Sequence, residues 1–206
     1  MPSPTRYVII LLTVTAILVT GDAFAEDTDL QIVVHVDNYA DILRPERSVA
    51  EEFATQIYAK AGVRIVWATG DDRADAPGLH VRVQLLPSDM AMRKIKTDGL
   101  ADTVFGMAAR GAGRAYIFTH RIARQAHRRS DDFRRLLGQI IAHEVGHLVL
   151  PPHSHSDDGI MRANIGVRST SDLRFTTEQG VAIRTMLTGA SVLRRASMTE
   201  AAVIDR

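Results

Sequence analysis

Segment 140–161, with the sequence IIAHEVGHLVLPPHSHSDDGIM, constrains the fold of this chain more than any other part of it. It contains four of the eight histidines, a glutamate directly after the first of them, and two adjacent prolines. The apolar residues around its first half recur at helical spacing: Phe133, Leu136, Leu137, Ile140, Ile141 and Leu148. This spacing predicts a helix with one buried face. Because the residue before a proline is disfavoured in a helix, we expect the helix to end before Pro151.

A metal-binding pair is predicted on this helix. His143 and His147 are one turn apart, so their imidazoles share one face and can bind one cation. Zinc binds neutral imidazoles, and three protein ligands leave one position for a water whose pKa falls to about 7. Glu144 lies beside the pair, where its carboxylate can accept a proton from that water. The H-E-x-x-H pattern therefore indicates amide hydrolysis with Glu144 as general base. A helix with two surface histidines is the plainer alternative, which the apolar stripe and the His-rich loop disfavour.

A third ligand is needed, and the candidates are His153, His155 and Glu178. The segment from His143 onward resembles the metzincins, zinc endopeptidases with the motif H-E-x-x-H-x-x-G-x-x-H and a later Met-turn. The family's glycine, which permits a sharp turn, corresponds to Leu150 in this chain. The prolines end the helix instead, so we expect a longer loop, which favours His155 over His153. With Glu178 as the ligand, the site would be that of a gluzincin.

The same segment also resembles a narrower group of uncharacterised exported bacterial proteins classed as metalloproteases. Their pattern, H-E-x-G-H-L-L-L-G-x-x-x-H-S-x-x-G-I-M-R-A, aligns its third histidine with His155, although it has a glycine at the position of Pro151. The similarity covers most of the chain beyond its N-terminal segment. The metzincin resemblance implies that Met161 forms an apolar floor beneath the metal, in a turn that Gly159 permits.

The other elements follow from alternation, helical spacing and turn residues. Strands are expected at residues 30–36, 63–68 and 79–86, and on both sides of the RGAGR turn at 102–109 and 114–119. Helices are expected at 45–61, at 120–129, from a cap at Ser130 or Asp131 to the prolines, and from Thr176 to near Gly189. Thr176 and Gln179 fit a capping box, and segment 87–100 is expected to be irregular. This order of elements predicts one α+β domain.

The resemblance to metzincins implies more about the fold than the spacing does. It implies a twisted mixed sheet packed on the N-terminal helix and on the H-E-x-x-H helix, followed by the Met-turn and a C-terminal helix. It also implies a substrate that lies extended along an edge strand above the zinc ion. We expect that strand in the pair around the RGAGR turn, where a bound peptide can add one strand to the sheet.

The first 25 residues have the layout of a secretory signal peptide. Arg6 precedes an apolar run at 7–19, and the small-x-small pattern A-F-A follows at 23–25. We expect cleavage after this pattern, a zinc peptidase domain at 26–190 and a C-terminal tail at 191–206. The product would be secreted or periplasmic, without a stable membrane span. An uncleaved anchor is the alternative, although the apolar run is short for a span of roughly 20 residues.

Composition narrows the choice of function. The chain has no cysteine, so a metal site in it must use histidine and carboxylate ligands. The net charge of +1 implies no nucleic-acid partner, and Asp131 and Asp132 interrupt the arginine-rich stretch 110–135. We therefore expect an exported Zn²⁺-dependent endopeptidase that acts on peptides or proteins. Two alternatives stay open: a non-catalytic zinc-binding module, which needs the histidines but not Glu144, and a zinc hydrolase of a non-peptide amide.

Overall fold

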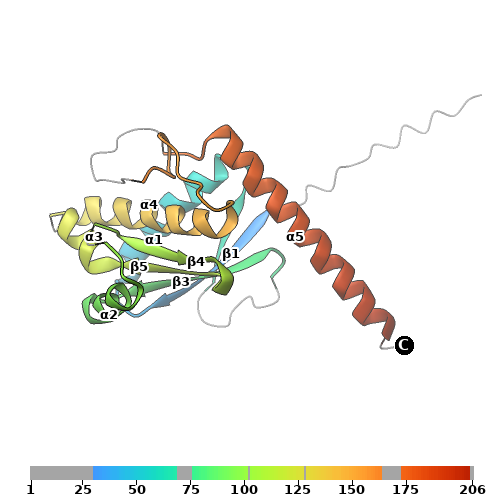
Figure 1. Cartoon of the computed structure of the whole chain (residues 1–206), viewed down its shortest axis with the longest axis horizontal. Coiled ribbons are helices and arrows are strands. Elements are labelled where there is room, and N and C mark those ends of the chain that lie inside the picture. The colour runs from blue at the N-terminus through green and yellow to red at the C-terminus, as the bar shows by residue number, and fades with distance from the viewer. Residues whose placement is uncertain (1–29, 69–75, 102, 128, 164–172, 205–206) are drawn as a thin grey trace, which may run out of the picture.

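The computed structural model describes residues 30–68, 76–101, 103–127, 129–163 and 173–204, and for 194–204 only the backbone. The expected signal peptide at 1–25 lies outside these ranges. The strands are β1 (Gln31–Asn38), β2 (Arg64–Ala68), β3 (Leu79–Leu86), β4 (Gly106–Ala109) and β5 (Arg114–Phe118). The helices are α1 (Arg44–Ala59), α2 (Ser88–Asp98), the 3-10 turn η1 (Arg110–Ala112), α3 (Thr119–Gln125), α4 (Ser130–Val149) and α5 (Thr177–Ile204) (Figure 1).

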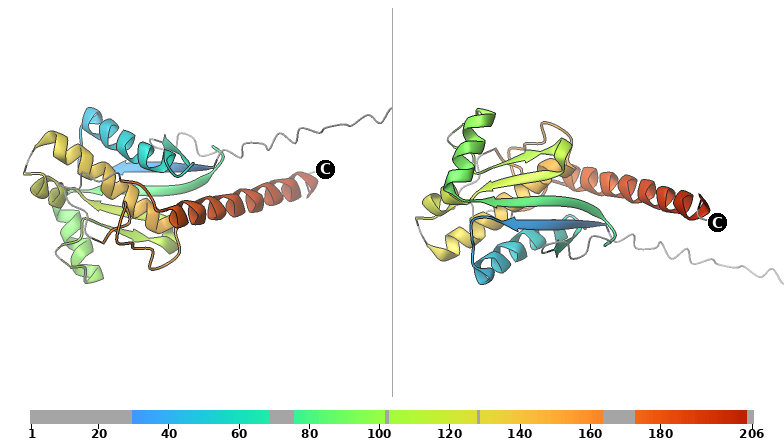
Figure 2. Two further views of the ribbon diagram at one scale, coloured as in Figure 1. Left: turned by 90° about the horizontal axis from the view of Figure 1, so that it is seen from above. Right: turned by 90° about the horizontal axis from the view of Figure 1, so that it is seen from below.

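The described strands form one mixed sheet in the order β2-β1-β3-β5-β4. Strand β1 pairs in parallel with β2 and β3, β3 pairs in parallel with β5, and β4 runs antiparallel to β5. Helices α1 and α4 lie side by side against one face of this sheet (Figures 1 and 2). The predicted α+β fold, with a mixed sheet, an N-terminal helix, a histidine-bearing helix and a C-terminal helix, is confirmed.

The main core lies between the sheet and helices α1 and α4. Alternate residues of the central strands contribute to it: Ile32, Val34, Val81, Val83, Leu85, Ala115 and Ile117. Helices α1 and α4 approach so closely that a Cβ atom on Gly138 would meet the carbonyl oxygen of Ala50. The buried Tyr58 hydroxyl also donates a hydrogen bond to the carbonyl oxygen of Ala142 (3.1 Å). These contacts fix α4 against α1 and the sheet.

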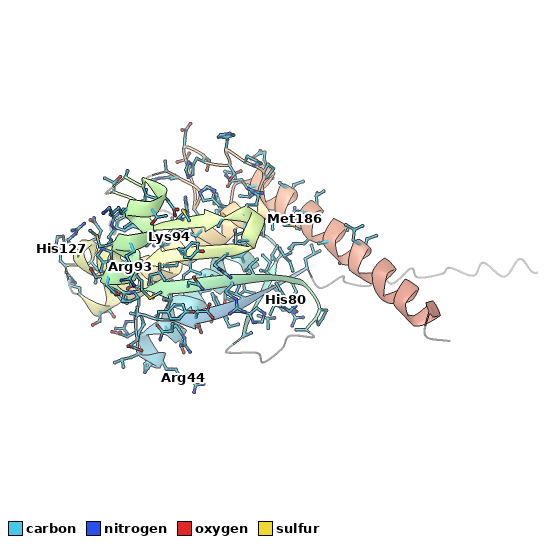
Figure 3. The ribbon with its side chains drawn as sticks, turned by 60° about the horizontal axis from the view of Figure 1, so that its bottom comes forward. Arg44, His80, Arg93, Lys94, His127 and Met186 are labelled. Carbon is cyan, nitrogen blue, oxygen red and sulfur yellow. The ribbon has the colours of Figure 1, made fainter. Side chains whose placement is uncertain are left out.

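The opposite face of the sheet is covered in part by α2. Leu86 and Phe118 each follow a residue of the main core, so strand alternation turns them to this face, where they pack with Ala91 and Ile95. This face also carries hydrogen-bonded and ion-paired side chains of β1 and β3. Figure 3 brings this face forward and shows His80 of β3 on it.

Helix α2 corrects one prediction, because segment 87–100 was expected to be irregular. Only Ala91 and Ile95 of this helix are buried. Two buried apolar residues in three turns are too few to show helical spacing in the sequence. Helix α2 is stabilised by packing of these residues against the sheet. The helix ends at Gly99, which adopts the left-handed conformation common at helix C-termini (φ 62°).

The start of α4 also differs from the prediction. No side-chain cap forms, and the N-cap residue is Arg129 rather than Ser130 or Asp131. Asp131 instead lies in the first turn and forms an ion pair with Arg134 (2.7 Å). A carboxylate in the first turn is stabilised by the positive end of the helix dipole, which substitutes in part for a cap.

Helix α5 starts as predicted and ends later than predicted. The capping box is confirmed: the Thr176 N–H donates to Gln179 Oε1 (3.0 Å) and the Gln179 N–H donates to Thr176 Oγ1 (3.3 Å). The helix continues to Ile204, so the expected stop near Gly189 is wrong, and most of the expected tail at 191–206 is helical. An interior glycine costs only about 1 kcal/mol relative to alanine and does not end a helix.

The second half of α5 projects away from the rest of the domain (Figure 1). Val192 and Leu193, which lie in this half, are 56% and 73% exposed. Among the helices in the described ranges, none is long and apolar enough to cross a membrane.

Candidate metal centre

Helix α4 brings His143 and His147 together. Their Nε2 atoms are 3.0 Å apart, and the two rings meet edge to face at 85°. The Nδ1 atom of His143 lies 2.9 Å from the carbonyl oxygen of Ile160. Because a carbonyl oxygen can only accept, Nδ1 carries the hydrogen, and Nε2 presents its lone pair toward His147. This is the arrangement in which a backbone carbonyl orients a metal-binding histidine.

The third imidazole comes from His155. Its Nε2 atom is 3.1 Å from Nε2 of His147, and the three histidines each contribute one nitrogen to a group within 4.8 Å. Two nitrogens bound to one tetrahedral zinc ion are roughly 3.3 Å apart, given Zn–N distances of about 2.0–2.1 Å. The separations of His147 Nε2 from the other two nitrogens, 3.0 and 3.1 Å, are close to this value, so the group fits a zinc ion. In the described part of the chain, no second group of three such side chains converges in this way.

Burial keeps the helix-borne imidazoles in the form that binds metals. It lowers the pKa of His143, despite the hydrogen bond to Ile160 that acts in the opposite direction. It also lowers the pKa of His147 to about 4, with smaller contributions from the positive charges of His143, His155 and Arg110. A metal ion binds neutral imidazole, so both residues can act as ligands at neutral pH.

The other two candidates for the third ligand lie outside this group. His153 is exposed on the loop. Glu178 is exposed in the first turn of α5, where a hydrogen bond from its own backbone and a second from the Thr176 side chain lower the pKa of its carboxyl group. The structure therefore brings His155, and neither His153 nor Glu178, to the pair on α4. Its role as a metal ligand stays a prediction.

The loop after α4 leaves the helix as expected but turns at an unexpected residue. Leu150 is extended (φ −95°, ψ 158°) and buried, so the chain makes no glycine-type turn there. His153 instead adopts the left-handed conformation (φ 59°), which is uncommon for a residue with a side chain. The turn at His153 allows the chain to return toward the helix within two residues. The sequence contains no signal for this turn, because the left-handed residue is a histidine and not a glycine.

Segment 159–161, the predicted Met-turn, packs against α4. Met161 is fully buried, and a Cβ atom on Gly146 would lie 2.6 Å from the Met161 sulfur. Gly159 has a φ of 77°, and a Cβ atom there would meet the carbonyl oxygen of Arg174. Ile160, between the two turn residues, donates its N–H to the same carbonyl oxygen (2.9 Å). The Met161 side chain thus packs against α4 at Gly146, the residue before His147. Its role as an apolar floor beneath a metal stays a prediction.

Glu144 lies between α4 and the edge strand β4. Its side chain is buried, and burial raises the pKa of its carboxyl group to about 8. A Cβ atom on Gly106 would lie 2.7 Å from the Glu144 Cγ atom, so the glycine of β4 makes room for the carboxylate. The contact between Gly106 and Glu144 is not predicted from the sequence, although a glycine inside a strand often marks the close approach of another group.

Comparisons with known proteins give the following result. No protein-family model and no curated protein sequence matches this chain. Among solved structures, the fold is similar to that of a zinc-dependent peptidase from Methanocorpusculum labreanum, at 14% identity and a TM-score of 0.49, over 74% of this chain and 99% of that chain. It is also similar to archaemetzincin from Archaeoglobus fulgidus, in complex with malonate, at 16% identity and a TM-score of 0.46, over 75% of this chain and 100% of that chain. These likenesses concern the course of the backbone alone, and the three histidines of this chain follow the H-E-x-x-H…H order of the metzincin motif.

Proposed function

We propose that this protein is an exported zinc-dependent endopeptidase. His143, His147 and His155 hold the zinc ion, and Glu144 acts as the general base. The observation that carries the proposal is the convergence of three imidazole nitrogens next to a buried glutamate. A helix with ordinary surface histidines gives no reason for a loop histidine to lie with its Nε2 atom 3.1 Å from that of His147.

The residues divide the chemistry between them. His143, His147 and His155 would hold the zinc ion, which would supply a Lewis acid for the scissile carbonyl and for a water molecule. Glu144 accepts a proton from the attacking water and later donates it to the leaving amine. An efficient acid–base group has a pKa near the working pH, and burial raises the pKa of Glu144 in that direction. The carbonyl of Ile160 keeps the His143 ring in one orientation throughout.

A peptide is favoured over a non-peptide amide because of strand β4. This strand lies at the edge of the sheet, so one side of its backbone has no strand partner within the described sheet. Gly106 of β4 lies against Glu144. An extended peptide that pairs with the free side of β4 would therefore pass close to the general base.

Export is the part of the proposal that depends on the N-terminal sequence alone. The short apolar run and the A-F-A pattern support cleavage after residue 25. N-terminal sequencing of the protein from its native host should begin at or near Glu26. An intact Met1 in the membrane fraction would indicate a retained anchor instead.

The variant Glu144→Gln tests catalysis separately from metal binding. Glutamine keeps the shape of the side chain but cannot accept the proton. We expect unchanged zinc content by elemental analysis and a loss of peptide cleavage of about a hundredfold or more. Wild type that holds zinc but cleaves no member of a peptide library would favour the non-catalytic module. Wild type that holds no zinc would contradict the metal centre itself.

A further inference from the structure

The loop that carries His155 is tied to the first turn of α5 by one side chain. Gln179 Nε2 donates hydrogen bonds to the carbonyl oxygen of Ser154 (2.9 Å) and to Oγ of Ser156 (3.2 Å). These two residues flank His155 on either side. A single amide group on α5 therefore holds the loop directly before and directly after the third imidazole.

The same amide group also belongs to the capping box of α5. Its Oε1 atom accepts the backbone N–H of Thr176 (3.0 Å). Thr176 N–H can only donate and the Ser154 carbonyl can only accept, so one orientation of the Gln179 amide satisfies both. All of the polar atoms of this side chain are therefore engaged, with the oxygen on the helix and the nitrogen on the loop.

The loop residues bound by Gln179 extend the connection to the rest of the centre. Ser154 Oγ lies 3.4 Å from His147 Nδ1. Ser156 donates its backbone N–H to the carbonyl oxygen of Met161 (3.0 Å) and its hydroxyl to that of Asp158 (2.7 Å). Gln179 is therefore connected through Ser154 to His147 and through Ser156 to Met161.

The His155 ring needs such support, because it is exposed. Core packing holds His143, but an exposed imidazole on a loop is held chiefly by its own backbone. The backbone on both sides of His155 is fixed through Gln179. We propose that Gln179 is a positioning residue for the third metal ligand, acting through Ser154 and Ser156 and not as a ligand itself. This inference rests on the proposed metal centre.

The variant Gln179→Glu separates the two roles of this side chain in the full-length chain. Glutamate is the usual residue at this position of a capping box, so the bond from Thr176 is kept. Both donors to the loop are lost, and a carboxylate oxygen then faces the Ser154 carbonyl oxygen. The matched control is Thr176→Ala, which removes the Oγ1 acceptor of the capping box and leaves the Gln179 amide group intact.

Zinc affinity, measured by competition with a chelator, is the main readout. Loss of a residue that orients a metal ligand usually weakens metal binding by about 10- to 100-fold. We expect Gln179→Glu to bind zinc at least about tenfold more weakly than wild type. Thr176→Ala should lower the melting temperature but leave zinc affinity within about twofold, because it affects the helix and not the loop.

A second readout needs no metal. The Ser156 backbone N–H is bonded to the Met161 carbonyl oxygen, so its hydrogen exchange reports on the order of the loop. In zinc-free protein, exchange at this amide should be faster in Gln179→Glu than in wild type and unchanged in Thr176→Ala.

Several outcomes would overturn the inference. One is zinc affinity for Gln179→Glu within twofold of wild type, and another is an equal loss in both variants, which would reduce Gln179 to a helix cap. If Gln179→Glu does not fold, Ser156→Ala removes one of the two loop acceptors, and unchanged zinc affinity in that variant would also overturn it. If wild type binds no zinc, the proposed metal centre is wrong. The role of Gln179 is then tested by hydrogen exchange alone: equal exchange rates of the Ser156 amide in wild type and Gln179→Glu would contradict it.

Discussion

The candidate metal centre has two parts that are held in different ways. The helical part consists of His143, Glu144 and His147 on α4, and the loop part is segment 150–161, which carries His155. In the helical part, His143 and Glu144 are 7% and 6% exposed. In the loop part, the His155 ring is exposed and its backbone is held by hydrogen bonds. Core packing therefore holds His143 and Glu144, and half-buried His147 shares their helix, while polar contacts to α5 position His155.

The two parts should therefore respond differently to mutation. A buried side chain on a packed helix belongs to the core as well as to the site, so removing it leaves a cavity and unpaired polar groups. An exposed side chain on a loop can be removed at little cost to folding.

The largest effect is expected from loss of a histidine. His143→Ala and His155→Ala should each abolish stable zinc binding, since two imidazoles cannot hold the ion as three do. In zinc-free protein, His143→Ala should also lower the melting temperature, whereas His155→Ala should leave it unchanged. Elemental analysis and thermal unfolding of both variants, with and without a chelator, measure these effects.

The matched control for the loop part is His153→Ala, two residues away. His153 is exposed and its side chain is not part of the converging group, so this variant should keep its zinc. Zinc retained by His155→Ala and lost by His153→Ala would mean that the ordinary metzincin spacing applies without its glycine.

The second prediction concerns the pH dependence of the zinc-free protein. The pKa of Glu144 is raised from 4.5 to about 8 on folding, so between these values the folded state holds a proton that the unfolded state has released. Stability therefore falls as the pH rises through this range. The pKa of His147 is lowered from 6.5 to about 4, so this residue makes stability rise with pH between these values. The two effects oppose each other up to pH 6.5, and only the loss from Glu144 remains above it.

We expect the zinc-free protein to lose about 2 kcal/mol of stability between pH 6.5 and pH 8. Urea unfolding at the two pH values measures this loss. Glu144→Gln is the control, because it removes the titrating group and should abolish the loss. If the stability of the wild type stays constant between pH 6.5 and pH 8, the Glu144 carboxyl group is not buried enough for its pKa to be raised.

The third prediction concerns the contact between Gly106 of β4 and Glu144. A methyl group on Gly106 would come within 2.7 Å of the Glu144 Cγ atom and within 2.8 Å of the Tyr116 carbonyl oxygen. Gly106→Ala should therefore displace the carboxylate and lower kcat for peptide cleavage by about tenfold or more, with zinc content little changed.

Gly111→Ala is the control for this experiment, in the turn between β4 and β5. A Cβ atom on Gly111 meets nothing within 4 Å, so this variant should behave as wild type. If the two alanine variants have the same kcat, the contact between Gly106 and Glu144 does not matter for the reaction.

The helical part was largely predictable from the sequence. Apolar residues at helical spacing indicate which face of α4 is buried, and His143 and His147 follow on the same helix. The end of α4 before Pro151 is equally local, since proline acts on the residue before it. Three predictions were wrong. Few buried residues mark α2, no side chain caps the start of α4, and the glycine at position 189 does not end α5.

Local sequence patterns thus indicate the helix, its pair of histidines, the glutamate beside them and a short set of candidates for the third ligand. Long-range contacts bring His155 to the pair and place Gly106 of β4 beside Glu144. The physical reason is the range of the interactions. Helical spacing and proline act over a few residues, whereas the position of His155 depends on a left-handed turn at His153 and on hydrogen bonds from Gln179, a residue that only folding brings close to the loop.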